Sequence, residues 1–385
     1  MASSESDQIH HGVIVVDAHA DIELPDKPSA YCGRDGHSKV APNKMARGGV
    51  DCTVMAVAVG PGRRNDAGVA SARRLADRKL AAALDLVAED PAVDLARSAA
   101  DVRRAYGANR RSIMLGWQNT QMVGTDLNAI ADFHSAGCRI FALTHIGHNE
   151  FADSSRPNFD STTGQHEPRE EHGGLSALGR EAVERINGFG GVLDVSQLSE
   201  NATLQVLDIS DAPVIASHSN ARSRCDVSRN LSDREIDGIA ALSGVVCVTP
   251  FLGYLFDSTD EVLVANVRSA RVAAGLPAEY LYPFELYWEL PDPDERNDFL
   301  RTVRGHLGKA TVETMVDHLD HIVERVGIEH VGIGTDFNHG GGISGYQEAH
   351  DAPNVTHALV ARGYSSGAIA SIWGENLLRV VDAVA

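Results

Sequence analysis

The chain has 385 residues, of which 43% are hydrophobic and 23% are charged, and its formal net charge at pH 7 is −19. This hydrophobic content excludes an intrinsically disordered chain, which has too few apolar residues to form a core. The acidic balance disfavours nucleic acids and anionic membranes as partners, because both require a cationic protein surface. The composition fits a soluble enzyme.

Eight short apolar runs recur along the chain. Their continuous apolar pattern is typical of strands in a parallel sheet that is covered on both faces. They are Val13–Val16, Thr53–Val59, Ser112–Leu115, Arg139–Leu143, Gly191–Val195, Pro213–Ala216, Gly244–Val248 and His330–Ile333. Helical spacing fills intervals between them, as at 67–87, 127–136, 177–186, 232–242, 261–274 and 311–326. Eight strand–helix units predict an α/β fold, a (β/α)₈ barrel of the TIM type.

Two irregular segments and the C-terminal tail complete this organisation. Residues 25–49 and 149–174 follow the first and fourth runs, and long irregular segments in a barrel are usually binding loops or lids. Residues 354–384 are predicted as closing helices, one ended by Gly363 and the next capped by Ser365. No repeat, linker or low-complexity tract divides the chain. We therefore expect one domain over residues 1–385.

The cysteines and the first residues bear on the compartment. Five cysteines are scattered without a CxxC pair, a pattern typical of neither a disulfide framework nor a structural zinc site. Residues 1–12 lack the charged-then-apolar order of a secretory signal. No apolar run approaches the roughly 20 residues needed to cross a bilayer. We expect a cytoplasmic protein that does not span a membrane.

Polar side chains follow six of the eight predicted strands. The chemistry of a TIM barrel is located at the C-terminal ends of its strands, so these side chains are expected at one rim. In strand order they are His19 and Asp21, Gln118, His145, Gln197, His218, and Asp336 with Asn338 and His339. A convergence from six strands indicates a functional rim.

Four of these residues form a candidate metal site. His19, Asp21, His218 and Asp336 supply two imidazoles and two carboxylates, a ligand set that suits zinc, iron, manganese or cobalt. Four ligands around one ion leave a position open for water. The alternative is a polar network that only closes the top of the barrel.

Several segments together resemble the renal (membrane) dipeptidase family of zinc peptidases, from about Val13 to Val380. They are VVDAHAD, LTHIGHNEFADSS, VLDVSQLS, APVIASHSNAR, VDHLDHIVERVGIEHVGIGTDFNHG and RGYSSGAIASIWGENLLRV. The resemblance implies an amidohydrolase-type barrel, often a homodimer, that holds two zinc ions and cleaves dipeptides. It also implies that His19 and Asp21 bind the first zinc, that His218 binds the second, and that Asp336 orients water and carries its proton.

The resemblance also assigns substrate contacts. His145 matches the histidine that contacts the substrate carbonyl and steadies the tetrahedral intermediate. Arg229 matches the arginine that binds the terminal carboxylate, a role that suits a guanidinium because it donates two parallel hydrogen bonds. Asn338 and His339 precede three glycines that let the backbone approach a ligand, so both are expected to line the substrate site.

Two residues depart from the family pattern. Gln118 stands where the family has the glutamate that bridges the two metals, and Gln197 stands where it has a histidine of the second zinc. A bridging carboxylate places negative charge between two cations about 3.5–4 Å apart, whereas an amide is neutral and a poor ligand. We therefore predict one metal ion, zinc being favoured over other divalent transition metals, held by His19, Asp21, His218 and Asp336.

Three functions remain open from the sequence. The first is a one-metal hydrolase of a dipeptide or related amide that bears a carboxylate. The second is a non-hydrolytic tailoring enzyme, of the isomerase or lyase type, acting on an amino-acid-derived substrate at the same rim. The third is a metal-poor binding protein.

Overall fold

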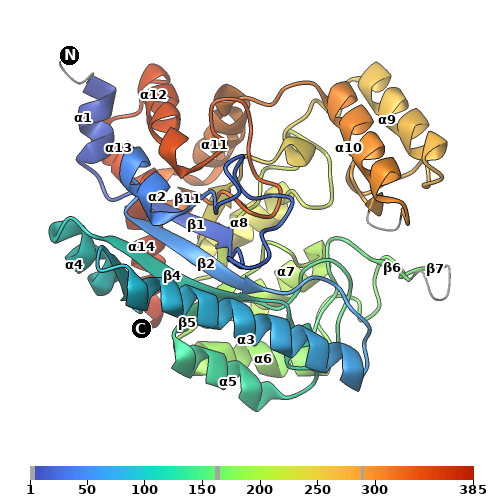
Figure 1. The fold of residues 1–385 in the computed structure, drawn as a ribbon, viewed down its shortest axis with the longest axis horizontal. Coiled ribbons are helices and arrows are strands. Elements are labelled where there is room, and N and C mark those ends of the chain that lie inside the picture. The colour runs from blue at the N-terminus through green and yellow to red at the C-terminus, as the bar shows by residue number, and fades with distance from the viewer. Residues whose placement is uncertain (1–4, 161–164, 288–289) are drawn as a thin grey trace.

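The eight predicted runs form parallel strands that follow one another around a barrel (Figure 1). The computed structural model describes residues 5–160, 165–287 and 290–385. The barrel strands are β1 Val16–Asp21, β2 Cys52–Ala58, β4 Arg111–Gln118, β5 Cys138–Ala142, β8 Val192–Asp194, β9 Ile215–Ala216, β10 Val245–Val248 and β11 Val331–Ile333. A bridge between Ala20 and Phe337 brings β1 and β11 together, and the Asp21 amide donates to the Phe337 carbonyl at 2.9 Å. The predicted (β/α)₈ barrel is confirmed.

The first strand begins later than the sequence indicated. The apolar run Val13–Val16 only leads into β1, which pairs with β2 from Val16 to Asp21. Polar residues can extend a strand when the neighbouring strand continues to pair with it. His19 and Asp21 therefore lie within β1 and not beyond its end. The unpredicted strand β3 (Val93–Ala96) pairs with the start of β4. A short hairpin of β6 (Phe159–Asp160) and β7 (Gln165–His166) lies in the irregular segment 149–174.

Helices occupy the intervals between the strands. They are α1 Glu5–His11, α2 Pro42–Gly48, α3 Asp66–Glu89, α4 Ala99–Gly107, α5 Leu127–Ala136, α6 Ala177–Gly188, α7 Glu200–Ile209, α8 Asp233–Ala241, α9 Glu261–Ala273, α10 Pro293–Leu307, α11 Val312–Val326, α12 Pro353–Ala361, α13 Ser366–Ala370 and α14 Asn376–Val384. Many begin at a serine, threonine, aspartate or asparagine whose side chain accepts an otherwise unpaired backbone N–H. Ser365 caps α13 in this way, as predicted, by accepting from the Ala368 amide. None of the helices in the described residues is long and apolar enough to cross a bilayer.

An insertion between β10 and α11 stands beside the mouth of the barrel. Figure 1 shows α9 and α10 next to each other and apart from α3, α5 and α6, on the side of the β6–β7 hairpin. The insertion packs its own small core, which includes Tyr254, Tyr282, Phe284, Phe299 and Val303. Because this core is aromatic, the insertion brings rings to the edge of the candidate site.

Candidate metal centre and active site

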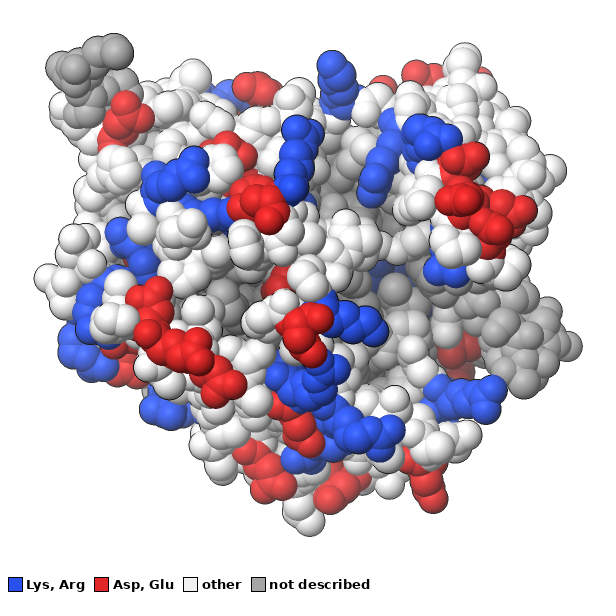
Figure 2. Space-filling view, viewed as in Figure 1, with Lys and Arg blue, Asp and Glu red and all other residues white. Residues whose placement is uncertain are grey.

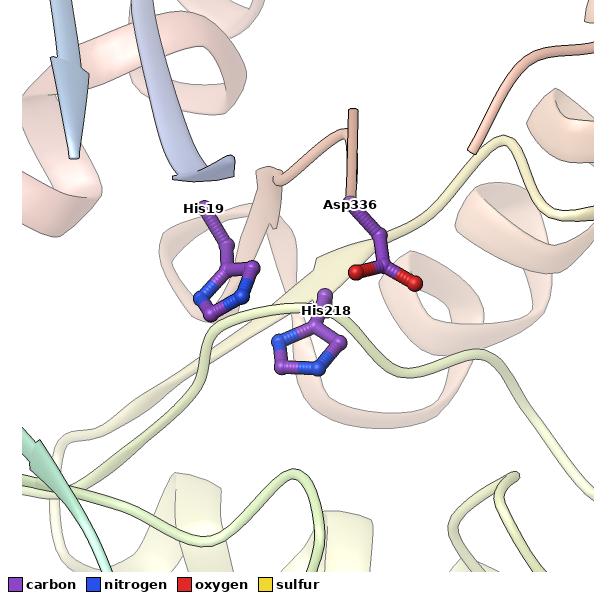
Figure 3. A group of neighbouring side chains, drawn as sticks. All are labelled: His19, His218 and Asp336. Atoms are coloured by element: carbon purple, nitrogen blue, oxygen red, sulfur yellow. The ribbon is translucent and has the colours of Figure 1, made fainter. Parts of the chain in front are cut away.

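Three side chains from separate strands converge at the barrel mouth. His19 belongs to β1, and His218 and Asp336 follow β9 and β11. One ligand atom of each lies within 4.8 Å of the others, and all three residues are buried. The two imidazole rings stack with their centroids 3.9 Å apart, and Figure 3 shows the Asp336 carboxylate facing both of them.

The polar atoms at this convergence fit a cation. Within the described part of the chain, His19 Nε2 and Asp336 Oδ1 are buried and have no hydrogen-bond partner. A buried polar atom without a partner is costly and requires an explanation such as an ion. Imidazole nitrogen and carboxylate oxygen are typical zinc ligands. The three residues therefore fit one divalent metal ion.

Asp21 lies beside this group without converging on it. Its Oδ1 is 3.7 Å from His19 Nε2, and its Oδ2 is 3.5 Å from the Lys79 ammonium. Burial favours the neutral carboxyl, but the positive charges of Lys79, His339 and His19 hold the pKa of Asp21 well below its usual range. Asp21 Oδ1 is buried and has no hydrogen-bond partner in the described residues, so Asp21 stays a predicted fourth ligand beside the three converging residues.

Hydrogen bonds fix the tautomer of His218. The Ser217 hydroxyl donates its proton to Asp194 Oδ2 at 2.6 Å, so it must accept from His218 Nδ1–H at 2.7 Å. A histidine that ligates a metal commonly donates its other ring N–H to such a partner. Burial, together with the charges of His19 and Arg229, lowers the pKa of His218 well below its usual value. His218 is therefore a neutral imidazole whose lone pair lies on Nε2.

The Gln197 amide lies against that lone pair, so an ion that binds His218 Nε2 displaces the Gln197 N–H. Gln197 Nε2 lies 2.9 Å from His218 Nε2, and its Oε1 accepts from Arg156 Nη2 at 2.8 Å. A guanidinium has only donors, so the amide oxygen must face Arg156 and the amide N–H must face His218. The Arg156–Gln197 pair thus places a hydrogen-bond donor, backed by a positive charge, where the family has a metal-ligating histidine.

Arg156 is buried and remains charged. Burial alone would lower its pKa, but Tyr254, Tyr282 and Asp336 raise it. Its guanidinium carbon lies 5.5 Å from the centre of the Tyr282 ring. Sequence reasoning identified the segment 149–174 as a binding loop but missed this residue, since nothing local marks which side chain of a loop turns inward.

Gln118 ends β4 as a buried, neutral side chain. Neither atom of its amide has a hydrogen-bond partner among the residues that the structure describes. A neutral amide contributes no charge to offset a second cation. Gln118 and Gln197 therefore bring neutral amides to the two positions where the family has a bridging glutamate and a histidine ligand.

His145 and His339 adjoin Asp336. Burial, with the charges of His339 and Arg156, lowers the pKa of His145 well below its usual value, so this imidazole is neutral. Both its ring nitrogens are buried and lack a hydrogen-bond partner in the described residues. His339 lies with its ring centroid 4.7 Å from that of His145 and its Nδ1 3.6 Å from Asp336 Oδ1. A neutral His145 has an N–H available for a substrate carbonyl.

Arg229 is buried and hydrogen-bonded to the backbone, which the sequence did not indicate. Only 1% of its surface is exposed, and its terminal nitrogens donate to the backbone carbonyls of Ser196 and His218. Its Nε is buried and has no hydrogen-bond partner in the described residues. Arg229 thus holds the ends of β8 and β9, and a role in binding carboxylate stays a prediction that depends on the remaining N–H groups.

The Asn338 side chain contacts the protein itself. Its Nδ2 donates to the Asp21 carbonyl at 2.8 Å and to Ser38 Oγ at 3.0 Å, and its Oδ1 accepts from the Lys39 amide at 2.9 Å. These contacts use both donors and the acceptor of the side chain. Asn338 therefore anchors the loop after β1 and has no spare N–H for a substrate.

We expect Asn338→Ala to lower the free energy of unfolding by about 1–3 kcal/mol, because it leaves buried backbone groups unpaired. The matched control is Asn354→Ala, which removes one exposed hydrogen bond to the Gly345 carbonyl and should cost less than about 1 kcal/mol. Urea denaturation of both variants measures the difference. Equal losses in the two variants would contradict the anchoring role.

A cavity of about 680 Å³ adjoins the converging residues. Asp336, His339 and Arg156 line its inner part, and the insertion and the loop after β1 line its outer part. Pockets for drug-sized ligands span about 300–1,000 Å³, so this cavity is large enough for a small organic substrate.

Comparison with known proteins gives concordant matches. The membrane dipeptidase family (peptidase family M19) matches residues 3–385. The chain is 31% identical to the probable dipeptidase PvdM from Pseudomonas aeruginosa, with a TM-score of 0.86 over 98% of this chain and 97% of that one. A metallo peptidase from Rhodobacter sphaeroides, solved with a phosphinate mimic of L-Ala-D-Ala, shares the fold at 22% identity, with a TM-score of 0.75 over 97% and 99% of the two chains.

Curated relatives are longer than this chain. Dipeptidase tcpJ from Claviceps purpurea is 27% identical over 76% of the chain, a match that spans 55% of the relative. Dipeptidase 3 from Macaca fascicularis is 26% identical over 72% of the chain and 47% of its own length. The chain thus spans about half the length of these two relatives.

Proposed function

The chain belongs to the membrane dipeptidase family, peptidase family M19, and on this premise we propose that it hydrolyses a dipeptide or related amide with one divalent metal ion. The observation that carries the proposal is the convergence of His19, His218 and Asp336 within 4.8 Å. Zinc is the favoured ion, because the set combines two imidazoles with a carboxylate. Asp21 adds negative charge beside His19.

The residues around this site can each take a separate chemical role in amide hydrolysis. A bound ion of this type supplies a water of lowered pKa and polarises the substrate carbonyl. The Asp336 carboxylate accepts a proton from the attacking water and passes it to the nitrogen that leaves as the C–N bond breaks. The neutral His145 donates a hydrogen bond to the carbonyl oxygen as negative charge develops there.

The proposal of a single ion is supported by the residues at the second position. Gln197 stands where a second ion would need a ligating histidine, and Arg156 holds its amide so that an N–H donor, not a lone pair, faces the site. The buried charge of Arg156 also repels a nearby dication. Gln118 brings no carboxylate to bridge two ions. This set of side chains therefore favours one bound ion.

The experiment that tests the function combines elemental analysis of the purified protein with a panel of L,L- and L,D-dipeptides. Metal together with hydrolysis of at least one dipeptide supports the proposal. Metal without hydrolysis would favour the non-hydrolytic tailoring enzyme, and absence of metal after incubation with zinc would favour a binding protein. Each result selects one of the three functions.

The Arg229 prediction is tested by comparing substrates with a free and an amidated C-terminus. If its remaining N–H groups bind the substrate carboxylate, Arg229→Ala should raise KM about 10-fold to 100-fold for the free acid and much less for the amide. Thermal unfolding of the variant separates this effect from the loss of its bonds to the β8 and β9 ends. Equal increases in KM for both substrates would remove the assignment.

A further inference from the structure

The outer part of the 680 Å³ cavity is lined largely by aromatic rings. Tyr282, Phe284 and Tyr287 come from the insertion, and Tyr31 comes from the loop after β1. The Tyr31 and Tyr287 hydroxyls form a hydrogen bond that joins these two segments across 256 residues of sequence. Rings from two segments offer planar surfaces on which a flat apolar group can stack.

Two arginines add positive charge to the same outer part. Arg34 and Arg304 line the cavity, and within the described residues neither has an ion pair or hydrogen bond. The Arg304 guanidinium carbon lies 5.9 Å from the centre of the Phe284 ring. Unpaired cations are notable in a chain of net charge −19. In Figure 2 acidic and basic side chains are mixed over this face, so the overall negative charge does not make it uniformly acidic.

The acidic side chains Glu348 and Asp351, which also line the cavity, already have partners within the protein. Glu348 forms an ion pair with the buried Lys44 at 2.8 Å, and His350 Nδ1 lies 3.5 Å from the same carboxylate. Asp351 accepts from the Gln347 amide at 2.9 Å. The outer cavity therefore has aromatic rings and uncompensated positive charge, which together complement an aromatic anion.

The position of the cavity relative to Arg229 indicates which half of the substrate enters its outer part. Arg229, which is predicted to bind the C-terminal carboxylate, lies behind the inner wall of the cavity, with its guanidinium carbon 5.1 Å from the ring of the lining residue Tyr254. With the C-terminal carboxylate at Arg229, the group in the outer part of the cavity is on the amino side of the bond that breaks. A free ammonium there would face Arg34 and Arg304 at a cost in free energy.

We propose that the substrate carries an aromatic group and a carboxylate on the amino side of the cleaved amide, as in an aromatic residue with an acidic acyl group. This inference rests on the proposed hydrolysis at the same site. Arg304 and Arg34 bind the distal carboxylate, and the rings of Tyr31, Phe284 and Tyr287 receive the aromatic group. A dipeptide with a free amino group is a poorer substrate.

The test uses three matched substrates and the metal-loaded enzyme. N-succinyl-Phe-Gly carries the ring and the charge, N-acetyl-Phe-Gly lacks the charge, and N-succinyl-Ala-Gly lacks the ring. We expect KM for the first to be about fivefold lower than for the second, since an exposed ion pair contributes up to about 1 kcal/mol. KM should be at least about tenfold lower than for the third, because an aromatic side chain is buried.

Two variants on α10 separate the charge effect from general damage. Arg304→Ala should abolish the preference for succinyl over acetyl, whereas Arg301→Ala, which removes an exposed arginine paired with Asp298, should leave it unchanged. Equal KM values for the succinyl and acetyl substrates, or a preference that survives Arg304→Ala, would overturn the proposal.

A binding measurement distinguishes failure of the subsite from failure of the hydrolase. Calorimetry with N-succinyl-phenylalanine and N-acetyl-phenylalanine, which have no Phe-Gly bond, measures the same charge preference without turnover. A fivefold preference that is lost in Arg304→Ala supports the subsite even if no substrate is cleaved. Hydrolysis without that preference would retain the proposed function and remove the subsite.

Discussion

Replacing Asp336 with asparagine should lower kcat by about 100-fold to 10,000-fold, the range that a positioned general base contributes. Asparagine has nearly the same shape, but its amide cannot accept a proton from water. His19 and His218 remain in place to bind the ion, so metal content should fall much less than activity. Steady-state kinetics and elemental analysis of the same preparation measure the two effects.

The control for this variant is a carboxylate that lines the same cavity. Asp351 accepts backbone hydrogen bonds, so Asp351→Asn should change kcat by less than about tenfold. Rates close to those of the wild type in Asp336→Asn would exclude Asp336 as the base. His339, whose Nδ1 lies 3.6 Å from Asp336 Oδ1, would then be the alternative proton acceptor.

Restoring the family residues should convert the site from one metal ion to two. The variant combines Gln118→Glu, Gln197→His and Arg156→Leu. The glutamate supplies a bridging charge, the histidine supplies a ligand, and the leucine removes the guanidinium that repels a second ion. His218 Nε2 is released at the same time, because the Gln197 amide that donates to it is gone. Metal content per chain should rise from one to two.

The matched control is Gln205→His. Gln205 lies on α7, where it contacts Leu175 and Gly173 outside the site, so this change adds a histidine without adding a ligand. Its metal content should stay at one per chain. A combined variant that is folded by circular dichroism and still binds one ion would contradict the role given to Gln118, Gln197 and Arg156.

Much of the fold could be predicted because its signals are local. Continuous apolar runs identified all eight barrel strands, and the rule that barrel chemistry follows the strands pointed to His19, His218 and Asp336. The position of β1 was less accurate, since polar residues such as Asp17 and His19 continue the strand through pairing with β2. Pairing between distant segments is not encoded in a local apolar pattern.

The contacts at the site that the sequence did not indicate share one physical origin. The contact of Lys79 with Asp21, the bond of Arg156 to Gln197 and the anchoring of the loop after β1 by Asn338 each join segments that are distant in sequence. Their geometry depends on how the segments pack. Residue type predicted that these side chains are polar, but not which atoms they meet.

The number of metal ions per chain is the most direct test of the account. Elemental analysis of the wild-type protein, loaded with excess zinc and then passed through a desalting column, should give one ion per chain. The His19→Ala variant treated in the same way should give a value well below one. Two tightly held ions in the wild type would contradict the conclusion that Gln118, Gln197 and Arg156 exclude the second.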